Sequence, residues 1–299
     1  MSGILSGLIG SFKKALDFTW TARTLPSSVD WRRIAWNGTV FCAISRGSTS
    51  AATSPDGITW TARTLSSSSG WYSIAWNGTV FCIVSETLGT TAATSPDGIT
   101  WTARTLPTSA AWTAVAWNGT VFCAVSDSST AAATSPDGIT WTARTMPAAL
   151  RHFSIGWNGT VFCAIGYGSN AAATSPDGIT WTARTMPSTS NWLAVAWNGT
   201  VFCATAASGT VAATSPDGIT WTARTMVTGG SWDGIAWNGS VFCAVDSSPS
   251  NISATSPDGI TWTTRTLPSS SGWINIAWNG TVFCAIATGS TAAATSPMS

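Results

Sequence analysis

The sequence is poor in charged residues and in the side chains on which most catalysis depends. Only 8% of its 299 residues are charged, the formal net charge is +1, and there is one histidine. Thirteen lysines and arginines against 12 acidic residues leave no basic excess to displace counterions from phosphates, so we expect no nucleic-acid partner. No CxxC pair occurs, and no cluster has metal-ligand spacing. We therefore expect neither a metal nor another cofactor.

Long apolar runs are missing as well. No stretch of about 20 apolar residues is present, so no membrane span is predicted. The N-terminal lysines, Lys13 and Lys14, follow the apolar stretch instead of preceding it, which is unlike a signal peptide. Synthesis and folding in a reducing cytosol are expected.

Disulfides are not expected either, although the chain has seven cysteines. Each cysteine occupies the same place in a recurring VFC motif. In a ring of such units with a radius of about 10 Å, equivalent positions would lie about 9 Å apart, too far for a disulfide. The pattern predicts seven small buried thiols: Cys42, Cys82, Cys123, Cys163, Cys203, Cys243 and Cys284.

The chain does have a strong internal repeat. The segment TSPDGITWTART stands complete at residues 94–105, 134–145 and 174–185. A WNG tripeptide recurs at steps of 40 or 41 residues, and its tryptophans mark seven units. A fixed period of this kind is typical of a repeat architecture with one continuous core. We therefore expect one domain over residues 17–299.

Each unit contains four segments rich in β-forming residues. In the second unit they cover residues 71–76, 80–84, 91–95 and 99–106. Asn77-Gly78, directly after the first segment, predicts a two-residue type I′ hairpin. Four antiparallel strands in every unit predict an all-β fold, a seven-bladed β-propeller with four-stranded blades.

The two ends of the chain complement each other. Residues 18–25 match the fourth strand of a unit that lacks the first three, and residues 292–297 match a third strand that lacks a fourth. Pairing of these two segments would close the ring and leave no exposed strand edge.

Residues 1–16 differ from the repeats and are treated as a separate segment. Their apolar residues recur at helical spacing and predict a short amphipathic helix: Ile4, Leu5, Leu8, Ile9 and Phe12. The helix could cap a hydrophobic opening of the ring or anchor the protein in a partner. A helix on a membrane surface is the least favoured alternative, because the segment has so few lysines.

The units differ from one another mainly in two places. These are the segment that leads from the fourth strand into the next first strand and the loop between the second and third strands. In an antiparallel blade both lie at the same end, while the WNG and SPDG turns lie at the other. Unrestrained loops drift, which explains part of the asymmetry, but a single varied face is also expected of a recognition surface. The candidate binding residues are Arg32, Arg33, Tyr72, Arg151, His152, Phe153, Leu193, Asp233 and Ile274.

His152 stands where the other six units have a tryptophan. A catalytic base would need an acid or a nucleophile held nearby, and the sequence offers no such signal. We expect a partly exposed substitution.

The motif SPDGITW resembles the Asp-box, the S-x-D-x-G-x-T-W hairpin of sialidase-like and other bacterial and viral propellers, with one residue fewer between Asp and Gly. The resemblance implies a peripheral turn in which the Asp and Ser side chains hydrogen-bond backbone amides while the Trp packs inward. It implies a structural role for six aspartates: Asp56, Asp97, Asp137, Asp177, Asp217 and Asp258. The shortened form is similar to repeat propellers in phage tail and other virion proteins.

Catalysis is not expected. A sialidase needs a cluster of unique arginines and a tyrosine nucleophile with a glutamate, whereas the repeated arginines here are equivalent and Glu86 is the only glutamate. The paired carboxylates of other glycosidases would have to break the repeat, and the acids that do so are scattered along the chain.

The expected function is therefore that of a non-catalytic virion component of a tailed phage, made in the host cytoplasm. A tail-fibre or receptor-binding part is favoured, with neighbouring virion proteins bound through residues 1–16 and a host surface receptor or glycan bound by the varied face. A capsid or tail decoration protein is one alternative. A multivalent lectin, with sugars stacked on tryptophans such as Trp71, is another, and a glycosidase is the remaining rival.

Overall fold

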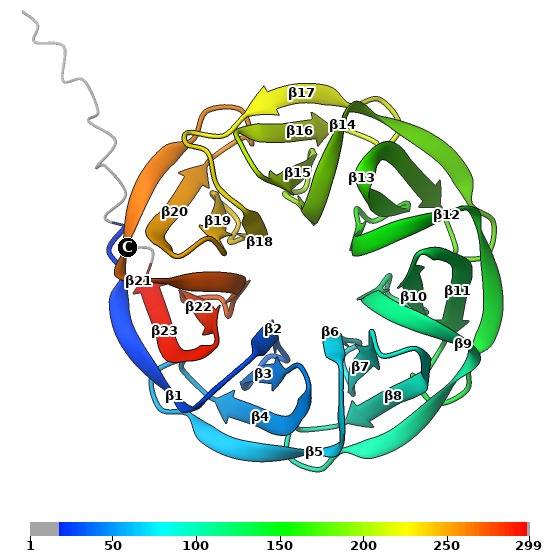
Figure 1. Cartoon of the computed structure of the whole chain (residues 1–299), viewed down its shortest axis with the longest axis horizontal. Helices are drawn as coiled ribbons and strands as arrows, with labels where there is room; N and C mark the ends of the chain where they lie inside the picture. Colours follow the sequence, from blue (N-terminus) through cyan, green and yellow to red (C-terminus); the bar gives the residue numbers. More distant parts are fainter. Residues whose placement is uncertain (1–17, 298–299) are drawn as a thin grey trace, which may run out of the picture.

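The computed structural model describes residues 18–297, and these residues form strands and turns without a helix. Figure 1 shows the strands arranged in a ring around a central opening. The fold is an all-β propeller, as the repeat predicted. The helix predicted at residues 1–16, with its five apolar residues, lies outside the described part of the chain. Within residues 18–297 no helix is long and apolar enough to cross a membrane.

Residues 18–297 form 23 strands, which follow the repeat. In the first half of the chain they are β1 (Thr21–Val29), β2 (Trp31–Trp36), β3 (Phe41–Ser45), β4 (Ser48–Ser54), β5 (Thr61–Ser69), β6 (Trp71–Trp76), β7 (Phe81–Ser85), β8 (Gly89–Ser95), β9 (Thr102–Trp117), β10 (Phe122–Asp127), β11 (Ser129–Ser135) and β12 (Thr142–Trp157). In the second half they are β13 (Phe162–Ser175), β14 (Thr182–Trp197), β15 (Phe202–Ala207), β16 (Val211–Ser215), β17 (Thr222–Thr225), β18 (Trp232–Trp237), β19 (Phe242–Asp246), β20 (Ser250–Ser256), β21 (Thr263–Trp278), β22 (Val282–Thr288) and β23 (Ser290–Pro297).

Consecutive strands pair antiparallel, from an inner strand beside the opening to an outer strand at the rim. The order β2-β3-β4-β5 is the simplest case. The longer strand β9 serves two neighbours, because its first part pairs with β8 and its last part pairs with β10. The outer strand of one unit therefore continues directly into the inner strand of the next, as it does in β12, β14 and β21.

The first strand pairs with the last. Thr21 lies opposite Thr295 and Thr24 opposite Ala292 in the β1–β23 ladder. The hydrogen-bonded strands form three separate sheets of 7, 12 and 4 strands, and none of these sheets closes on itself. The sheets end where an outer strand and the next inner strand are separate, as at β5 and β6. All neighbouring units pack through their side chains.

The core lies between neighbouring units. One cluster brings Cys42 and Ile44 of β3 together with Trp71 of β6 and Phe81 of β7. Trp71 and Phe81 are fully buried, and their counterparts in other units are also among the largest buried side chains. All seven cysteines are buried free thiols. Burial raises the pKa of each thiol strongly, in Cys163 to about 12, so these side chains behave as small apolar groups at neutral pH.

The turn after each inner strand differs from the predicted hairpin. Trp76 pairs with Phe81, so four residues, not two, connect β6 to β7. Only Gly78 has a positive φ, +98°, whereas a type I′ turn needs a positive φ at Asn77 as well. Asn77 instead closes the turn with its side chain, because its Oδ1 accepts the amides of Thr79 at 2.9 Å and Val80 at 2.7 Å.

Candidate functional site

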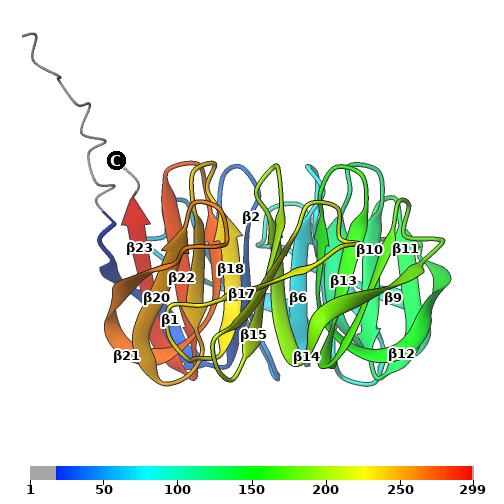
Figure 2. The same cartoon turned by 90° about the horizontal axis from the view of Figure 1, so that it is seen from above.

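The strand pairing places both variable segments at one end of the ring. In the second unit, Trp71 lies opposite Ser85 and Gly89 opposite Ala110, so both segments meet there. The WNG and SPDG turns lie at the other end, where Phe81 pairs with Trp76 and Ser95. We call these the varied end and the uniform end. Figure 2 shows the ring from the side, with turns at both ends.

Every inner strand has a β-bulge near the varied end. In β6, Trp71 pairs with Ser85 and Ser73 with Val84, so Tyr72 between them is left without a partner across the ladder. A bulge of this kind re-aims one side chain, and bulges are common beside functional sites. The equivalent bulge residues of the seven units are Arg32, Tyr72, Thr113, Phe153, Leu193, Asp233 and Ile274.

Six of these bulge residues line one cavity at the varied end of the central opening. The cavity has a volume of about 340 Å³, which suits a small ligand. Seven of the nine candidate residues lie in its lining: Arg32, Tyr72, Arg151, Phe153, Leu193, Asp233 and Ile274. Arg33 lines an adjacent cavity of about 190 Å³, and Leu193 and Asp233 line both cavities.

His152 is not part of this lining. Its side chain is fully buried, so the expectation of a partly exposed residue is wrong. The reason is the bulge, because the side chain at the tryptophan position stays in the interior while the next residue, Phe153, lines the cavity. Nδ1 of His152 lies 3.3 Å from the carbonyl oxygen of Ser126, and Nε2 has no hydrogen-bond partner. Burial lowers the pKa of His152, which favours the neutral ring.

Aromatic rings form one side of the cavity. The rings of Tyr72 and Phe153 stack at 5.7 Å between centroids, and Tyr167 meets Phe153 edge-on at 5.0 Å. The guanidinium of Arg151 lies 4.8 Å from the centre of the Tyr167 ring. Tyr167 was not among the candidates, although it lies in one of the variable loops and is one of only two tyrosines.

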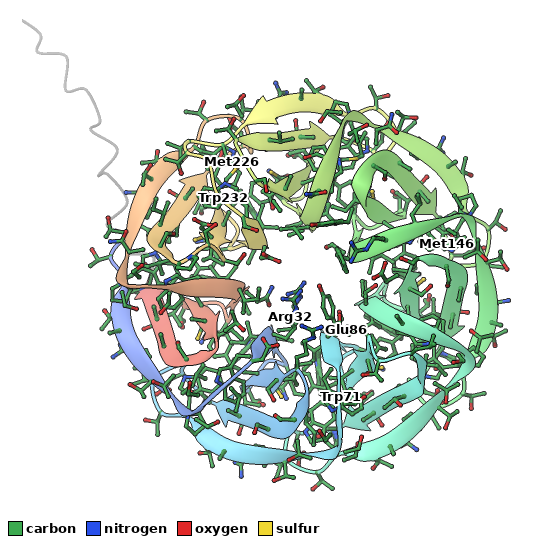
Figure 3. The ribbon with its side chains drawn as sticks, viewed as in Figure 1. Arg32, Trp71, Glu86, Met146, Met226 and Trp232 are labelled. Carbon is green, nitrogen blue, oxygen red and sulfur yellow. The ribbon has the colours of Figure 1, made fainter. Side chains whose placement is uncertain are left out.

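Two neighbouring arginines lie beside the Tyr72 ring, Arg32 in the lining of this cavity and Arg33 in that of the adjacent one. The guanidinium carbon of Arg32 lies 4.1 Å from the centre of the Tyr72 ring, and that of Arg33 lies 5.3 Å from the same centre. Arg32 donates from Nη2 to the Tyr72 hydroxyl, and Arg33 donates from Nη1 to the Arg32 carbonyl at 3.0 Å. Figure 3 shows Arg32 in the central opening of the ring.

The two arginines differ in how the surroundings affect them. Burial acts to lower the pKa of Arg32, but attraction from Tyr72 and Asp233 outweighs it and the pKa is raised. Burial and the neighbouring charge of Arg32 together lower the pKa of Arg33. Both side chains remain cations near neutral pH, because an arginine pKa starts so high.

Hydroxyl groups and one carboxylate form the remaining side. Asp233 accepts hydrogen bonds from the hydroxyls of Ser247 and of Ser231, the latter at 3.3 Å. Ser231, Ser247 and Thr288 complete this part of the lining. The three hydroxyl residues were not candidates, although they lie in or beside the variable segments.

Two other arginines of the varied end have carboxylate partners. Arg46 pairs with Glu86 and lies 3.8 Å from Asp30, while Arg151 pairs with Asp127 at 3.1 Å. Within residues 18–297, neither Arg32 nor Arg33 has a carboxylate at salt-bridge distance. No group of three or more His, Cys, Asp or Glu side chains in that range could hold a metal ion.

The uniform end holds the six repeated aspartates. Asp97 accepts the backbone amides of Ile99 at 2.8 Å and Thr100 at 3.1 Å, and Ser95 donates to it at 3.1 Å. Trp101 donates from its indole nitrogen to the Gly98 carbonyl. The aspartates of the other five turns have the same amide contacts.

Trp71 cannot stack against a sugar, as the lectin alternative required. It is 0% exposed, and its indole nitrogen donates to the Ser67 carbonyl at 2.9 Å. The equivalent tryptophans in five other units are equally buried: Trp31, Trp112, Trp192, Trp232 and Trp273.

Comparisons with known proteins agree on the fold. The model of the DUF6242 β-propeller domain matches residues 62–193, less than half of the chain. A catalytically inactive variant of virginiamycin B lyase from Staphylococcus aureus, in a structure with quinupristin, is 9% identical with a TM-score of 0.84, over 95% of this chain and 100% of that one. The structure of YCF48 bound to D1 peptide is 15% identical with a TM-score of 0.75, over 95% and 97%.

A third structure, the Cps50 (Swd1) β-propeller domain of Myceliophteria thermophila, is 11% identical with a TM-score of 0.69, over 94% of this chain and 100% of that one. A search of curated protein sequences finds no match to this chain. At these identities the structural likeness shows the propeller fold alone, and the site has to be interpreted from its own residues.

Proposed function

We propose that this protein is a non-catalytic binding protein, a closed propeller of seven blades whose recognition site is the cavity at the varied end. One observation carries the proposal. The bulge position, which lines the cavity in six of the seven units, holds seven different residue types in units that are otherwise near copies of one another.

Drift of an unrestrained loop does not explain this variety. The bulge residues belong to strands, and six of the seven are buried, with Arg32 partly buried. The residue before each of them is tryptophan in six units and histidine in one, and the residue two positions after is isoleucine or valine in all. Diversity at the bulge residue, inside strands whose flanking tryptophan and isoleucine or valine positions are nearly constant, supports selection for an asymmetric surface.

The cavity lacks a pair of carboxylates and lacks a histidine. Asp233 is the only carboxylate in the lining of the two cavities, and the only histidine of the chain lies outside both. Ser247 donates to Asp233, but no histidine or second carboxylate lines the cavity beside them, which fits a ligand contact better than a reaction centre. The lyase with the same fold is too distant in sequence to lend its activity to this chain.

The biological setting follows from the resemblance of the SPDGITW turn to those of viral propellers. In that setting the protein is a virion component of a tailed phage, a tail-fibre or receptor-binding part with its varied end toward the host surface. Residues 1–16 attach it to a neighbouring virion protein. A decoration protein of the capsid or tail has the same site but a different place in the particle.

The test measures binding of the full chain to a panel of bacterial cells. Tyr167→Ala at the varied end is compared with Ile139→Ser, which alters a half-exposed side chain of the uniform end. We expect at least a tenfold loss of binding for Tyr167→Ala and none for Ile139→Ser. The reverse result would place recognition at the uniform end, and turnover of a cell-surface glycan would make the protein an enzyme.

A further inference from the structure

Two adjacent arginines, Arg32 in the lining of the larger cavity and Arg33 in that of the adjacent one, form no salt bridge within residues 18–297. Arg46 and Arg151 at the rim are half exposed and paired with carboxylates. Arg32 and Arg33 are less exposed, yet within the described residues neither has a carboxylate within 4 Å. Two adjacent guanidinium groups with reduced access to water repel each other, so an anion between or beside them would relieve an unfavourable arrangement.

The pair also has hydrogen-bond donors to spare. A guanidinium carries five N–H donors in a fixed fork. The side chain of Arg32 uses one nitrogen toward Tyr72, while its Nε is buried without any partner. Arg33 uses one nitrogen toward a backbone carbonyl. The unsatisfied Nε is costly unless a ligand or water accepts from it, and carboxylate and phosphate oxygens match the guanidinium fork best.

Asp233 restricts which anion fits. It belongs to the same lining as Arg32, and its attraction, after the larger one of Tyr72, helps to raise the pKa of Arg32 against the effect of burial. A dianion such as a phosphate monoester would meet more repulsion from this carboxylate than a singly charged group would. Asp233 and the neighbouring serines instead offer acceptors and donors to hydroxyl groups on a ligand.

We infer that Arg32 and Arg33 form a carboxylate-binding site, whose ligand is a small hydroxylated acid that enters the cavity from the varied end. The carboxylate faces the two guanidinium groups, the hydroxyls face Asp233 and Ser247, and the carbon skeleton lies against Tyr167. The volume of about 340 Å³ accommodates a single sugar-sized unit. This inference rests on the proposed function in using the same cavity, and it adds the chemical class of the ligand.

The experiment compares three probes that share one ring skeleton. D-Glucuronate has the carboxylate, D-glucose has no charge, and glucose 6-phosphate is a dianion near neutral pH. Binding to the full chain is measured by titration calorimetry and by ligand-observed NMR. We expect glucuronate to bind at least tenfold more tightly than the other two. Equal binding of glucuronate and glucose, or no binding of glucuronate, would overturn the inference.

Substitutions test which residues bind glucuronate. Arg32→Gln should weaken glucuronate binding at least tenfold, and Arg32→Lys, which keeps the charge but loses the fork, should weaken it less. Asp233→Asn should improve glucose 6-phosphate binding several-fold by removing the repelling carboxylate. The matched control is Arg63→Gln. Arg63 lies on the outer strand β5, away from the cavity, and its Nε donates to the hydroxyl of Thr53. If Arg63→Gln weakens glucuronate as much as Arg32→Gln, the acid binds elsewhere.

Thermal unfolding of each variant separates loss of the site from loss of the fold. If Arg32→Lys folds like the parent protein but binds glucuronate and glucose equally well, the inference is wrong.

A glucuronate-terminated oligosaccharide distinguishes a free acid from the end of a glycan. It binds as well as the monosaccharide only if the cavity accepts the end of a chain. If cell binding depends on the varied end but the protein does not bind glucuronate, the carboxylate site is refuted and the proposed function is not. If glucuronate binding depends on the arginines but cell binding does not depend on the varied end, the proposed function is refuted and the carboxylate site is not.

Discussion

The two ends of the ring are built on the same repeated backbone but use it in opposite ways. At the uniform end every WNG glycine has a φ between 95 and 98°, and in all seven turns the asparagine Oδ1 accepts a backbone amide at 2.7 Å. At the varied end the bulge is equally regular, yet the side chain that it presents changes in every unit. Constancy at one end follows from backbone geometry that few residues can adopt. Variety at the other is possible because a bulge fixes a direction and not a residue type.

Replacement of a turn glycine should give the largest effect on stability. Gly98 has a φ of +76°, and a Cβ there would lie 2.9 Å from Thr53 Cγ2 and 3.3 Å from Cys42 Sγ of the neighbouring unit. Gly98→Ala combines backbone strain with a packing clash and should lower the free energy of unfolding by about 3 kcal/mol. Chemical denaturation monitored by tryptophan fluorescence measures the change.

Gly78→Ala is the matched control for this substitution. Its φ is +98°, but a Cβ there would meet nothing within 4 Å. Only the strain remains, so a loss of about 1 kcal/mol is expected. Equal losses for the two variants would show that contact between units at the uniform end contributes little.

Much of the structure of the two ends could be predicted from the sequence. The strand expected at residues 71–76 is β6, and the ends of the chain pair as their repeat positions predicted. Hydrophobic periodicity and turn chemistry are local signals, so a single unit already contains them. The choice of varied-end candidates was equally local, and most of them line one cavity.

The features that the sequence did not predict depend on contacts between residues that are distant in the chain or on the exact strand register. The bulge shifts the register by one residue, which buries His152 and turns Phe153 toward the cavity. Asn77 closes a four-residue turn through its side chain, although Asn-Gly is also the signature of a shorter hairpin. Tyr167 reaches the site from a different strand, and its meeting with Phe153 is a tertiary contact.

The aspartate turns should give an intermediate effect that depends on pH. Burial acts to raise the pKa of Asp97, but amide hydrogen bonds from Ile99 and Thr100 outweigh it and lower the pKa below its usual 3.8. The unfolded chain therefore takes up the proton first, so the stabilisation is present above pH 3.8 and disappears as the pH falls through the lower folded value. Asp97→Ala should cost about 1 kcal/mol at neutral pH through the lost hydrogen bonds.

Asp97→Asn distinguishes the charge from the hydrogen bonds. Asparagine keeps an Oδ1 acceptor but does not titrate, so this variant should lose less stability than the parent protein between neutral pH and pH 3. Denaturation midpoints measured across that range test the difference. A parallel loss in both proteins would mean that Asp97 does not contribute to acid sensitivity.

The rim of the varied end should give the smallest effect on stability. Arg151 is half exposed, pairs with Asp127 at 3.1 Å and lies 4.8 Å from the centre of the Tyr167 ring. Exposed ion pairs are weak and cation–π contacts at such sites add little, so Arg151→Ala should lower the free energy of unfolding by less than about 1 kcal/mol. The loss should shrink further in 0.5 M salt, because screening weakens the pair in the parent protein.

The same variant should affect cell binding far more than stability. Arg151 covers the aromatic side of the cavity, so its removal changes the shape and charge that a ligand meets. Asp127→Asn breaks the ion pair but leaves Arg151 in place, and it should preserve binding if the arginine itself is the contact. If Arg151→Ala loses stability but not cell binding, Arg151 has a structural role only. The two ends of the ring would then differ in sequence but not in function.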